Sequence, residues 1–142
     1  MADDGRGIFA SMSDIREVAM DLGLTGRIAM VTGGSHGLGK QAAYTLAREG
    51  CKVSICARGQ DQLDATIQEF RAQGFEAHGT AADVTSDADS NRFYEETVSN
   101  LGHPDILVNN AGGRRGSAIF EETTMEQFRD GLEFNLISAV RF

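Results

Sequence analysis

The residues best suited to chemistry in this sequence form a glycine-rich segment, Thr32-Gly33-Gly34-Ser35-His36-Gly37-Leu38-Gly39. An apolar run precedes the segment and a helical pattern follows it, so its glycines permit a tight turn that aims backbone N–H groups from the positive end of a helix dipole. Such a turn is suited to binding a pyrophosphate. Glycines also form ordinary turns, and the segment alone leaves both interpretations open. A P-loop is disfavoured, because Lys40 is followed by Gln41 rather than by Ser or Thr.

Two further pairs of residues follow apolar runs. Ala57-Arg58 ends the second run, where an acidic residue would bind the free 2′-hydroxyl of NAD and an arginine suits the 2′-phosphate of NADP. Arg58 therefore favours NADP, with His36 as a weaker second contact. Asp83-Val84 ends the third run. Asp83 could accept from the adenine amino group or cap the helix that follows, and its chemistry leaves both roles open.

Amide side chains end the fourth run, where Asn109 and Asn110 are followed by Ala111-Gly112. Buried amides are costly without partners, so we expect each to bind either neighbouring backbone or a ligand. Asn135 raises the same question, because its spacing from the apolar residues of the last predicted helix places it on the buried face of that helix.

The charge balance disfavours several classes of partner. Thirteen Lys and Arg against twenty-one Asp and Glu give a formal net charge of −8, which repels nucleic acids and anionic lipids. No segment reaches the roughly eighteen apolar residues of a membrane span, and Asp3 and Asp4 stand where a signal peptide would be basic. Cys51 and Cys56 lack the spacing of metal ligands, so we expect no metal site, a buried Cys56 and a reducing, cytoplasmic location.

Apolar runs without polar alternation predict strands over residues 28–32, 52–57, 76–81 and 106–109. Three helices are predicted between them, and glycines at 50, 74 and 102 mark their ends. Their apolar stripes are Leu38, Ala42 and Leu46, then Leu63, Ile67 and Phe70, then Phe93, Val98 and Leu101.

A fourth helix is predicted from near Thr123, which forms a capping-box pair with Glu126, to the end of the sequence. Its apolar face comprises Met125, Phe128, Leu132, Leu136 and Ala139.

The alternation of strands and helices predicts an α/β fold, a doubly wound parallel sheet of the Rossmann type with strand order 3-2-1-4. Residues 25–142 are expected to form this domain, and residues 1–24 an N-terminal extension that is either a short docking helix or a tail. The carboxyl ends of parallel strands share one edge, so the segments described above should converge there. We expect the sheet to be incomplete, leaving the fourth strand and the last helix with exposed apolar residues.

Over essentially all of residues 25–142 the sequence resembles the short-chain dehydrogenase/reductase family. Thr32-Gly33-x-x-x-Gly37-x-Gly39 is similar to the cofactor motif of that family, and Asn109-Asn110-Ala111-Gly112 to its second motif. A finer similarity is to 3-oxoacyl-carrier-protein reductases and sugar-acid dehydrogenases. The resemblance implies that Asp83 and Val84 contact adenine, that Asn110 to Gly112 line the nicotinamide ribose side, and that Asn135 is the asparagine of the catalytic tetrad.

The family pattern also requires a Ser and a Tyr-x-x-x-Lys, in which the tyrosine is the general acid or base and the lysine lowers its pKa. The only tyrosines here are Tyr44 and Tyr94, which are followed four positions later by Arg48 and Val98. Both are predicted to be packing residues. The domain is therefore expected to be truncated before the catalytic Ser and Tyr-x-x-x-Lys.

The sequence thus predicts an NADP(H)-dependent oxidoreductase that transfers hydride between nicotinamide and a small carbonyl or alcohol substrate, with NAD as the less favoured cofactor. The 142-residue chain alone is expected to be inactive, and the full-length form to be a homo-oligomer. The alternative is a catalytically inactive dinucleotide-binding module. A methyltransferase that uses S-adenosylmethionine is disfavoured, because such an enzyme would have an acidic residue at the end of the second strand, where this sequence has Arg58. Arg114 and Arg115 could meet an anionic substrate or serve as solvated loop residues.

Overall fold

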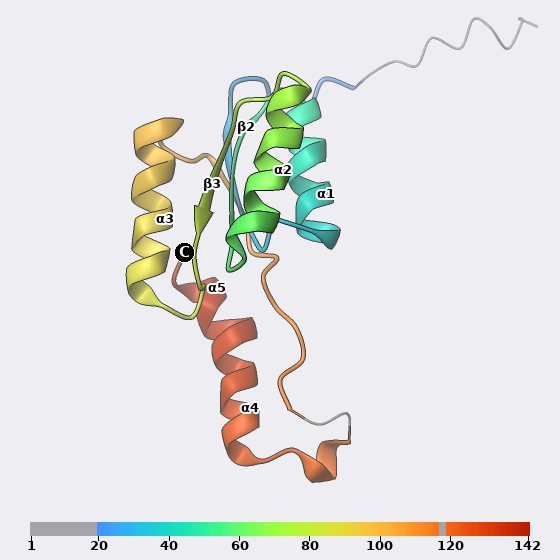
Figure 1. Ribbon diagram of the computed structural model, residues 1–142, viewed down its shortest axis with the longest axis vertical. Helices are drawn as coiled ribbons and strands as arrows, with labels where there is room; N and C mark the ends of the chain where they lie inside the picture. The colour runs from blue at the N-terminus through green and yellow to red at the C-terminus, as the bar shows by residue number, and fades with distance from the viewer. Residues whose placement is uncertain (1–19, 117–118) are drawn as a thin grey trace, which may run out of the picture.

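The computed structural model describes residues 20–116 and 119–142 (Figure 1). Most of the predicted N-terminal extension lies outside these residues. The first part of the chain forms β1 (Ile28–Thr32), α1 (Gly37–Arg48), β2 (Lys52–Ala57), α2 (Gln60–Ala72), β3 (Ala77–Ala81), α3 (Asp87–Asn100) and β4 (Ile106–Val108). The second part forms a 3-10 turn (Phe120–Glu122), α4 (Met125–Leu132), a π-helical turn (Glu133–Ile137) and α5 (Ser138–Val140).

The four strands form one parallel sheet in the order β3-β2-β1-β4, which confirms the predicted topology. β1 lies at the centre and is buried along its whole length. Its middle residue Met30 pairs with Ser54 of β2 on one side and with Leu107 of β4 on the other. Because all strands run the same way, their carboxyl ends meet at one edge.

One face of the sheet is covered by α1 and α2, which Figure 1 shows on the side opposite α3. Leu63 and Phe70 of α2 are fully buried against this face. Phe70 also makes edge-to-face contacts with Tyr44 and Phe75, at ring-centroid distances of 5.9 Å and 6.1 Å. Aromatic pairs in this geometry add to the stability that area burial provides.

The opposite face is covered by α3 and by the end of the chain. Its core is smaller and consists of Met30, Cys56, Ala82, Val84 and Phe93, with Phe142 packed edge-to-face on Phe93 at 6.0 Å. The buried side of α3 is partly polar, since Thr97 shares a buried 2.7 Å hydrogen bond with Ser54 of β2. Val98, which was predicted to lie in the apolar stripe, is only half-buried.

The first helix buries a different face from the one predicted. Leu38 is 83% exposed, whereas Gly39, Ala43 and Ala47 are buried. The physical reason is close approach: a Cβ on Gly39 would lie 2.3 Å from the carbonyl oxygen of Gly33, so only glycine lets the start of α1 pack on the turn before it. The prediction is therefore wrong for Leu38, whereas Leu46 of the same stripe packs against the core.

The last helix begins one residue later than predicted. Thr124 is the N-cap, and its capping box is formed with Gln127 rather than between Thr123 and Glu126. Thr123 instead ends the preceding 3-10 turn, with its N–H donating to Phe120. After α4 the helix widens, and the Ser138 N–H donates to the carbonyl of Glu133 five residues back.

The exposed apolar residues agree with the expected incompleteness of the sheet. Leu107 of β4 is 40% exposed, and Phe128 and Leu132 of α4 are 46% and 43% exposed. Figure 1 shows α4 extending past the end of the sheet, so little of the described chain covers it. No helix within the described residues is long and apolar enough to cross a membrane.

Candidate functional site

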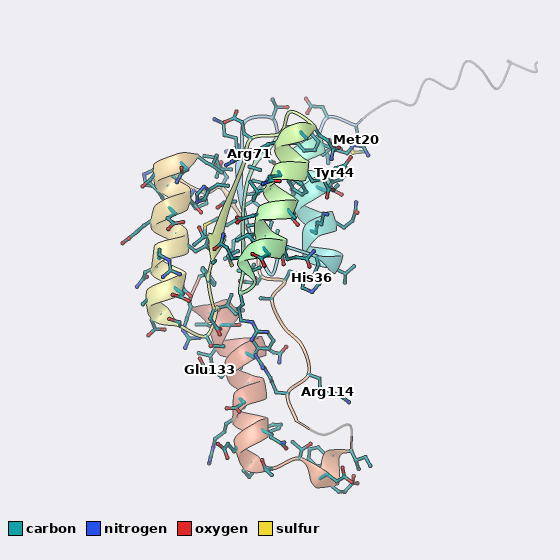
Figure 2. The ribbon with its side chains drawn as sticks, viewed as in Figure 1. Met20, His36, Tyr44, Arg71, Arg114 and Glu133 are labelled. Atoms are coloured by element: carbon teal, nitrogen blue, oxygen red, sulfur yellow. The ribbon has the colours of Figure 1, made fainter. Side chains whose placement is uncertain are left out.

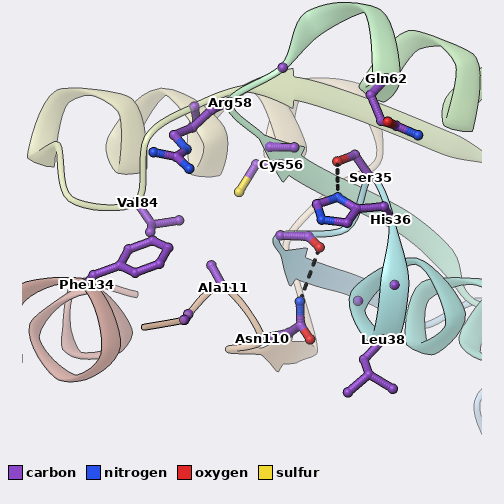
Figure 3. Close-up of a pocket in the computed structure, with 18 of the residues that line it drawn as sticks. Ser35, His36, Leu38, Cys56, Arg58, Gln62, Val84, Asn110, Ala111 and Phe134 are labelled. Carbon is purple, nitrogen blue, oxygen red and sulfur yellow. Dashed lines mark hydrogen bonds between the residues drawn. The ribbon is translucent and has the colours of Figure 1, made fainter. Parts of the chain in front are cut away.

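A cleft of about 740 Å³ opens at the carboxyl edge of the sheet, beyond the ends of β1, β2 and β4 (Figure 3). All but one of the residues predicted to bind a cofactor line it. These are Gly33, Ser35, His36, Gly37, Leu38, Gly39, Arg58, Val84, Asn110, Ala111 and Gly112. The exception is Asp83. Five segments that are distant in sequence therefore meet in one concave site. This agrees with the rule that ligands of open α/β sheets bind beyond the carboxyl ends of the strands.

The glycine turn combines rigid positions with an open one. Gly33 and Gly37 have φ values of +67° and +57°, in the left-handed region that favours glycine. A Cβ on Gly33 would lie 3.0 Å from Nδ2 of Asn110, so the Asn110 side chain already occupies the space beside Gly33. A Cβ on Gly37 would meet nothing within 4 Å. The space in front of Gly37 is the part of the turn open to a ligand.

The N-terminus of α1 faces this open space. His36 is the N-cap residue, but its side chain accepts no capping hydrogen bond, and the first turn contains no acidic residue. Figure 3 shows the His36 ring beside Ser35, whose hydroxyl lies 3.2 Å from Nδ1. The carbonyl of Ser35 accepts from the Thr66 hydroxyl at 2.9 Å, which holds the turn against α2. Uncapped N–H groups at a helix start suit an anion.

Asn110 holds the end of β4 against the turn after β1. Its Nδ2 donates to the carbonyls of Thr32 and Gly33 at 2.9 Å and 3.2 Å. The Thr32 hydroxyl in turn accepts from the N–H groups of Asn110 and Ala111, both at 3.0 Å. Asn109 donates to the carbonyl of Ala139 at 3.1 Å. Of the two partners that the sequence left open for these amides, neighbouring backbone is the one observed.

The cleft is positively charged. Its lining includes the arginines Arg58, Arg114 and Arg115, and none of the lining residues is acidic. This is unexpected in a chain with a net charge of −8. Among the described residues, no carboxylate forms an ion pair with Arg58. An unpaired guanidinium in a cleft without acids is suited to an anionic ligand.

Asp83 is not among the residues that line the cleft, and Thr85 holds its side chain. Its Oδ1 accepts from the backbone N–H of Thr85 at 2.9 Å and from the Thr85 hydroxyl at 2.7 Å. These two hydrogen bonds lower the pKa of Asp83, and the charges of Arg58 and Arg115 add to the effect. Capping of α3 falls to Ser86, which accepts from Asp89 N–H. The capping role suggested for Asp83 is therefore wrong, and its adenine contact stays a prediction.

Asn135 is exposed, which corrects the prediction of a buried position. It lies in the π-helical turn, beyond the sheet, so the helix face that its spacing selects meets no core. Its Oδ1 accepts from Gly113 N–H at 2.8 Å, and its Nδ2 donates to the carbonyls of Gly113 and Gly131 at 2.9 Å and 2.8 Å. The amide thus joins the loop after β4 to the last helix.

Nine lining residues were not among the predicted cofactor contacts, and Cys56 and Phe134 are two of them. Cys56 was expected only in the core; it is fully buried, and burial raises the pKa of its thiol to about 12. Phe134 also lines the cleft, facing Val84 and Arg58 in Figure 3. Its only sequence signal is that it directly precedes Asn135.

The two tyrosines lie outside the cleft. Tyr44 packs on Phe70 and Phe75, as predicted, and its hydroxyl donates to Gln73 at 2.9 Å. Tyr94 is 44% exposed, so the packing role predicted for it is wrong. Within the described residues, no group of three His, Cys, Asp or Glu side chains is arranged to hold a metal ion.

Comparison with known proteins identifies the family. The model of the family described as short chain dehydrogenase matches residues 27–142. The chain belongs to the short chain dehydrogenase family. This confirms the resemblance drawn from the two motifs.

Similar relatives are longer than this chain. A putative ketoacyl reductase of Streptomyces coelicolor is 39% identical over 114 residues, a match that covers 80% of this chain and 43% of the relative. The structure of an actinorhodin polyketide ketoreductase with NADPH matches with 38% identity and a TM-score of 0.75, covering 81% of this chain and 44% of that one. L-sorbose reductase from Gluconobacter frateurii, complexed with NADPH and L-sorbose, matches with 32% identity and a TM-score of 0.80, covering 86% and 46%. The chain therefore spans less than half the length of these relatives.

Proposed function

We propose that this chain provides the cofactor site of an NADP(H)-dependent oxidoreductase, in which hydride passes between nicotinamide and the carbonyl or alcohol group of a small-molecule substrate. The observation that carries the proposal is the positively charged cleft at the carboxyl edge of the sheet, which joins the open glycine turn to Arg58. Two structures similar to this chain were obtained with NADPH, which supports the choice of cofactor.

The cofactor fits the residues present. The uncapped N–H groups at the start of α1 would bind the pyrophosphate in the open space before Gly37. Arg58 would bind the 2′-phosphate, with His36 as a weaker contact, because a guanidinium makes charge-assisted hydrogen bonds to phosphate oxygens. Val84 and Asp83 would lie toward adenine. Asn110, Ala111 and Gly112 would line the nicotinamide ribose side.

Asn135 would act as a positioning residue of the proton relay. Its amide does not titrate near neutral pH, so it can orient a water or a neighbouring group but cannot itself supply the proton. Its three hydrogen bonds to Gly113 and Gly131 already fix its orientation. The bound cofactor supplies the hydride chemistry, while the protein supplies position and proton transfer.

The second candidate is a dinucleotide-binding module without catalysis. It is favoured by one observation: neither tyrosine of the 142 residues is followed four positions later by lysine. Tyr44 packs against Phe70 and Phe75, and Tyr94 lies outside the cleft. An oxidoreductase of this family would need a proton donor from other residues. A cytoplasmic location and a homo-oligomeric assembly stay predictions.

The cofactor proposal is tested by replacing Arg58 in the protein expressed from its natural reading frame. Arg58→Ala should lower the preference for NADPH over NADH, as a ratio of kcat/KM, by roughly ten- to a hundredfold, because a hydrogen bond to a charged group contributes about 1.5–3 kcal/mol. Arg48→Ala is the matched control, since it removes the same charge from an exposed residue at the far end of α1. Equal use of both cofactors by the unmodified protein would contradict the proposal.

A further inference from the structure

One aromatic ring at the edge of the cleft faces two arginines. The guanidinium carbon of Arg115 lies 4.2 Å from the centroid of the Phe134 ring, and that of Arg58 lies 5.9 Å from it. Both distances fall within the roughly 6 Å range of cation–π attraction. Phe134 itself is half-buried against the smaller core of the sheet, so its ring is a fixed support. The ring therefore holds both positive groups at the cleft.

The two guanidinium groups can act on the same anion. Both are within a few ångströms of one ring, so their central carbons are at most about 10 Å apart, roughly one Debye length at 0.1 M salt. No acidic residue lines the cleft to neutralise them. Asp83 interacts with both electrostatically, but one of its carboxylate oxygens is already engaged by Thr85. Like charges gathered with so little compensation suit a dianionic ligand.

The neighbouring arginine is placed differently. Arg114 directly precedes Arg115, and Figure 2 shows its side chain on the outer side of the loop, pointing away from the last helix. No described aromatic ring lies under its guanidinium, whereas Arg115 stacks on Phe134. The sequence leaves these two arginines equivalent, and the structure separates them. They therefore form a matched pair of equal charge and different orientation.

We propose that Arg115 is a second determinant of cofactor specificity, held over Phe134 so that it and Arg58 share the 2′-phosphate of NADP. This inference rests on the proposed function. A phosphate monoester carries about −1.5 to −2 charges at neutral pH, more than one guanidinium neutralises. Arg115 would act mainly through its charge, and Arg58 through direct hydrogen bonds.

The test measures binding rather than turnover, using two probes that differ by one phosphate. Calorimetric titrations with 2′,5′-ADP and with 5′-AMP should be made on the protein expressed from its natural reading frame. Arg115→Ala should weaken 2′,5′-ADP about five- to tenfold and 5′-AMP less than about twofold, and the difference should shrink as salt is raised, because screening reduces a Coulombic effect. Arg114→Ala removes the same charge from a lining residue that has no described ring under it, so it should change the ratio of the two affinities less than Arg115→Ala does. Arg48→Ala, outside the cleft, should change the ratio by no more than about twofold.

A conservative variant keeps the test decisive. Arg115→Lys keeps the charge but loses the planar group that stacks on Phe134, so its loss of 2′,5′-ADP affinity should be smaller than that of Arg115→Ala. If Arg115→Ala lowers the melting temperature, the Arg115→Lys variant is compared with the unmodified protein instead. Unchanged 2′,5′-ADP binding in both Arg115 variants, or equal losses for the two probes, would overturn this inference while a loss in Arg58→Ala still supported NADP. No preference for 2′,5′-ADP in the unmodified protein would instead overturn the proposed function.

Discussion

The two faces of the sheet bury their apolar residues to different degrees. Under α1 and α2, Leu63 and Phe70 are inaccessible to solvent. On the other side, Leu107 of the edge strand β4 is 40% exposed, and Phe128 and Leu132 of α4, which extends past the end of the sheet, remain nearly half exposed. The first face is thus complete within these residues, whereas the second has an apolar surface with no cover among the described residues.

The candidate site includes residues from both faces of the sheet, so its residues differ in how well the surrounding chain covers them. The glycine turn is anchored to the complete face through Thr66 and to β4 through Asn110. Phe134 and Asn135 belong to the last helix, on the less covered side. The turn proposed to bind phosphate thus belongs to the well-packed half of the chain, while the groups nearest the proposed chemistry stand on the less covered half.

The largest effect should come from truncating a phenylalanine on each face. Phe70→Ala removes a fully buried ring and should lower the free energy of unfolding by about 3–5 kcal/mol. Phe128→Ala removes a ring that is 46% exposed and should cost no more than about 1 kcal/mol. Chemical denaturation of the 142-residue chain measures both. Similar losses for the two variants would show that the contrast between the faces is wrong.

A smaller effect is expected from two glycines of the turn. Gly37→Val places a side chain in the open space before α1 and should weaken NADPH binding by about 2–3 kcal/mol. Because Gly37 has a φ of +57°, this variant should also lower the melting temperature, while the sheet stays folded by circular dichroism. Gly39→Ala should weaken binding similarly and lower the melting temperature for a different reason, because its Cβ would meet the Gly33 carbonyl at 2.3 Å. Unchanged NADPH affinity in Gly37→Val would contradict the proposal that the glycine turn binds the pyrophosphate.

The smallest effect uses the two cysteines as probes of local opening. Cys51 lies in the core of the complete face and Cys56 in that of the other. Burial raises the pKa of both thiols, that of Cys56 to about 12, so near neutral pH each reacts only when its surroundings open. Cys56 should be alkylated roughly tenfold faster, which corresponds to about 1.4 kcal/mol less cost of opening. Faster alkylation of Cys51 would reverse the comparison.

The same pKa shift has a consequence for stability. The folded pKa of Cys56 exceeds the value of about 8.5 for a free thiol, so the folded chain holds this proton more tightly than the unfolded chain. Its contribution is complete below about pH 8.5 and is lost as the pH rises toward about 12. Cys56→Ala should flatten this alkaline decline, as measured by denaturation at a series of pH values.

Much of the fold could be predicted from the sequence because the signals are local. Continuous apolar runs mark β1 and β2, and the crossover rule orders the strands. The predictions that were wrong failed because of packing between segments that are distant in the sequence. Leu38 fits a helical stripe by spacing, but close packing at Gly39 turns it outward. Asn135 fits a buried face, but the helix widens into a π turn and leaves the sheet.

The candidate site was predictable where its residues follow strand ends, because topology alone brings those positions to one edge. Phe134 and the orientation of Arg115 were not, since both depend on how the last helix and the loop after β4 lie across the cleft. Neither residue stands in a strand-end position or in a recognisable motif. A sequence pattern specifies neighbours along the chain, whereas these two meet only through the fold.

The most direct test of the account separates binding from turnover. NADPH affinity by titration, and oxidation of NADPH with a panel of ketones and oxoacyl thioesters, should be measured for the 142-residue chain and for the protein expressed from its natural reading frame. We expect the 142-residue chain to bind NADPH, to lose that binding in Gly37→Val, and to reduce no substrate, because no Tyr-x-x-x-Lys is present in it to protonate the developing alkoxide. Ketone reduction by the purified 142-residue chain that Gly37→Val abolishes would contradict it.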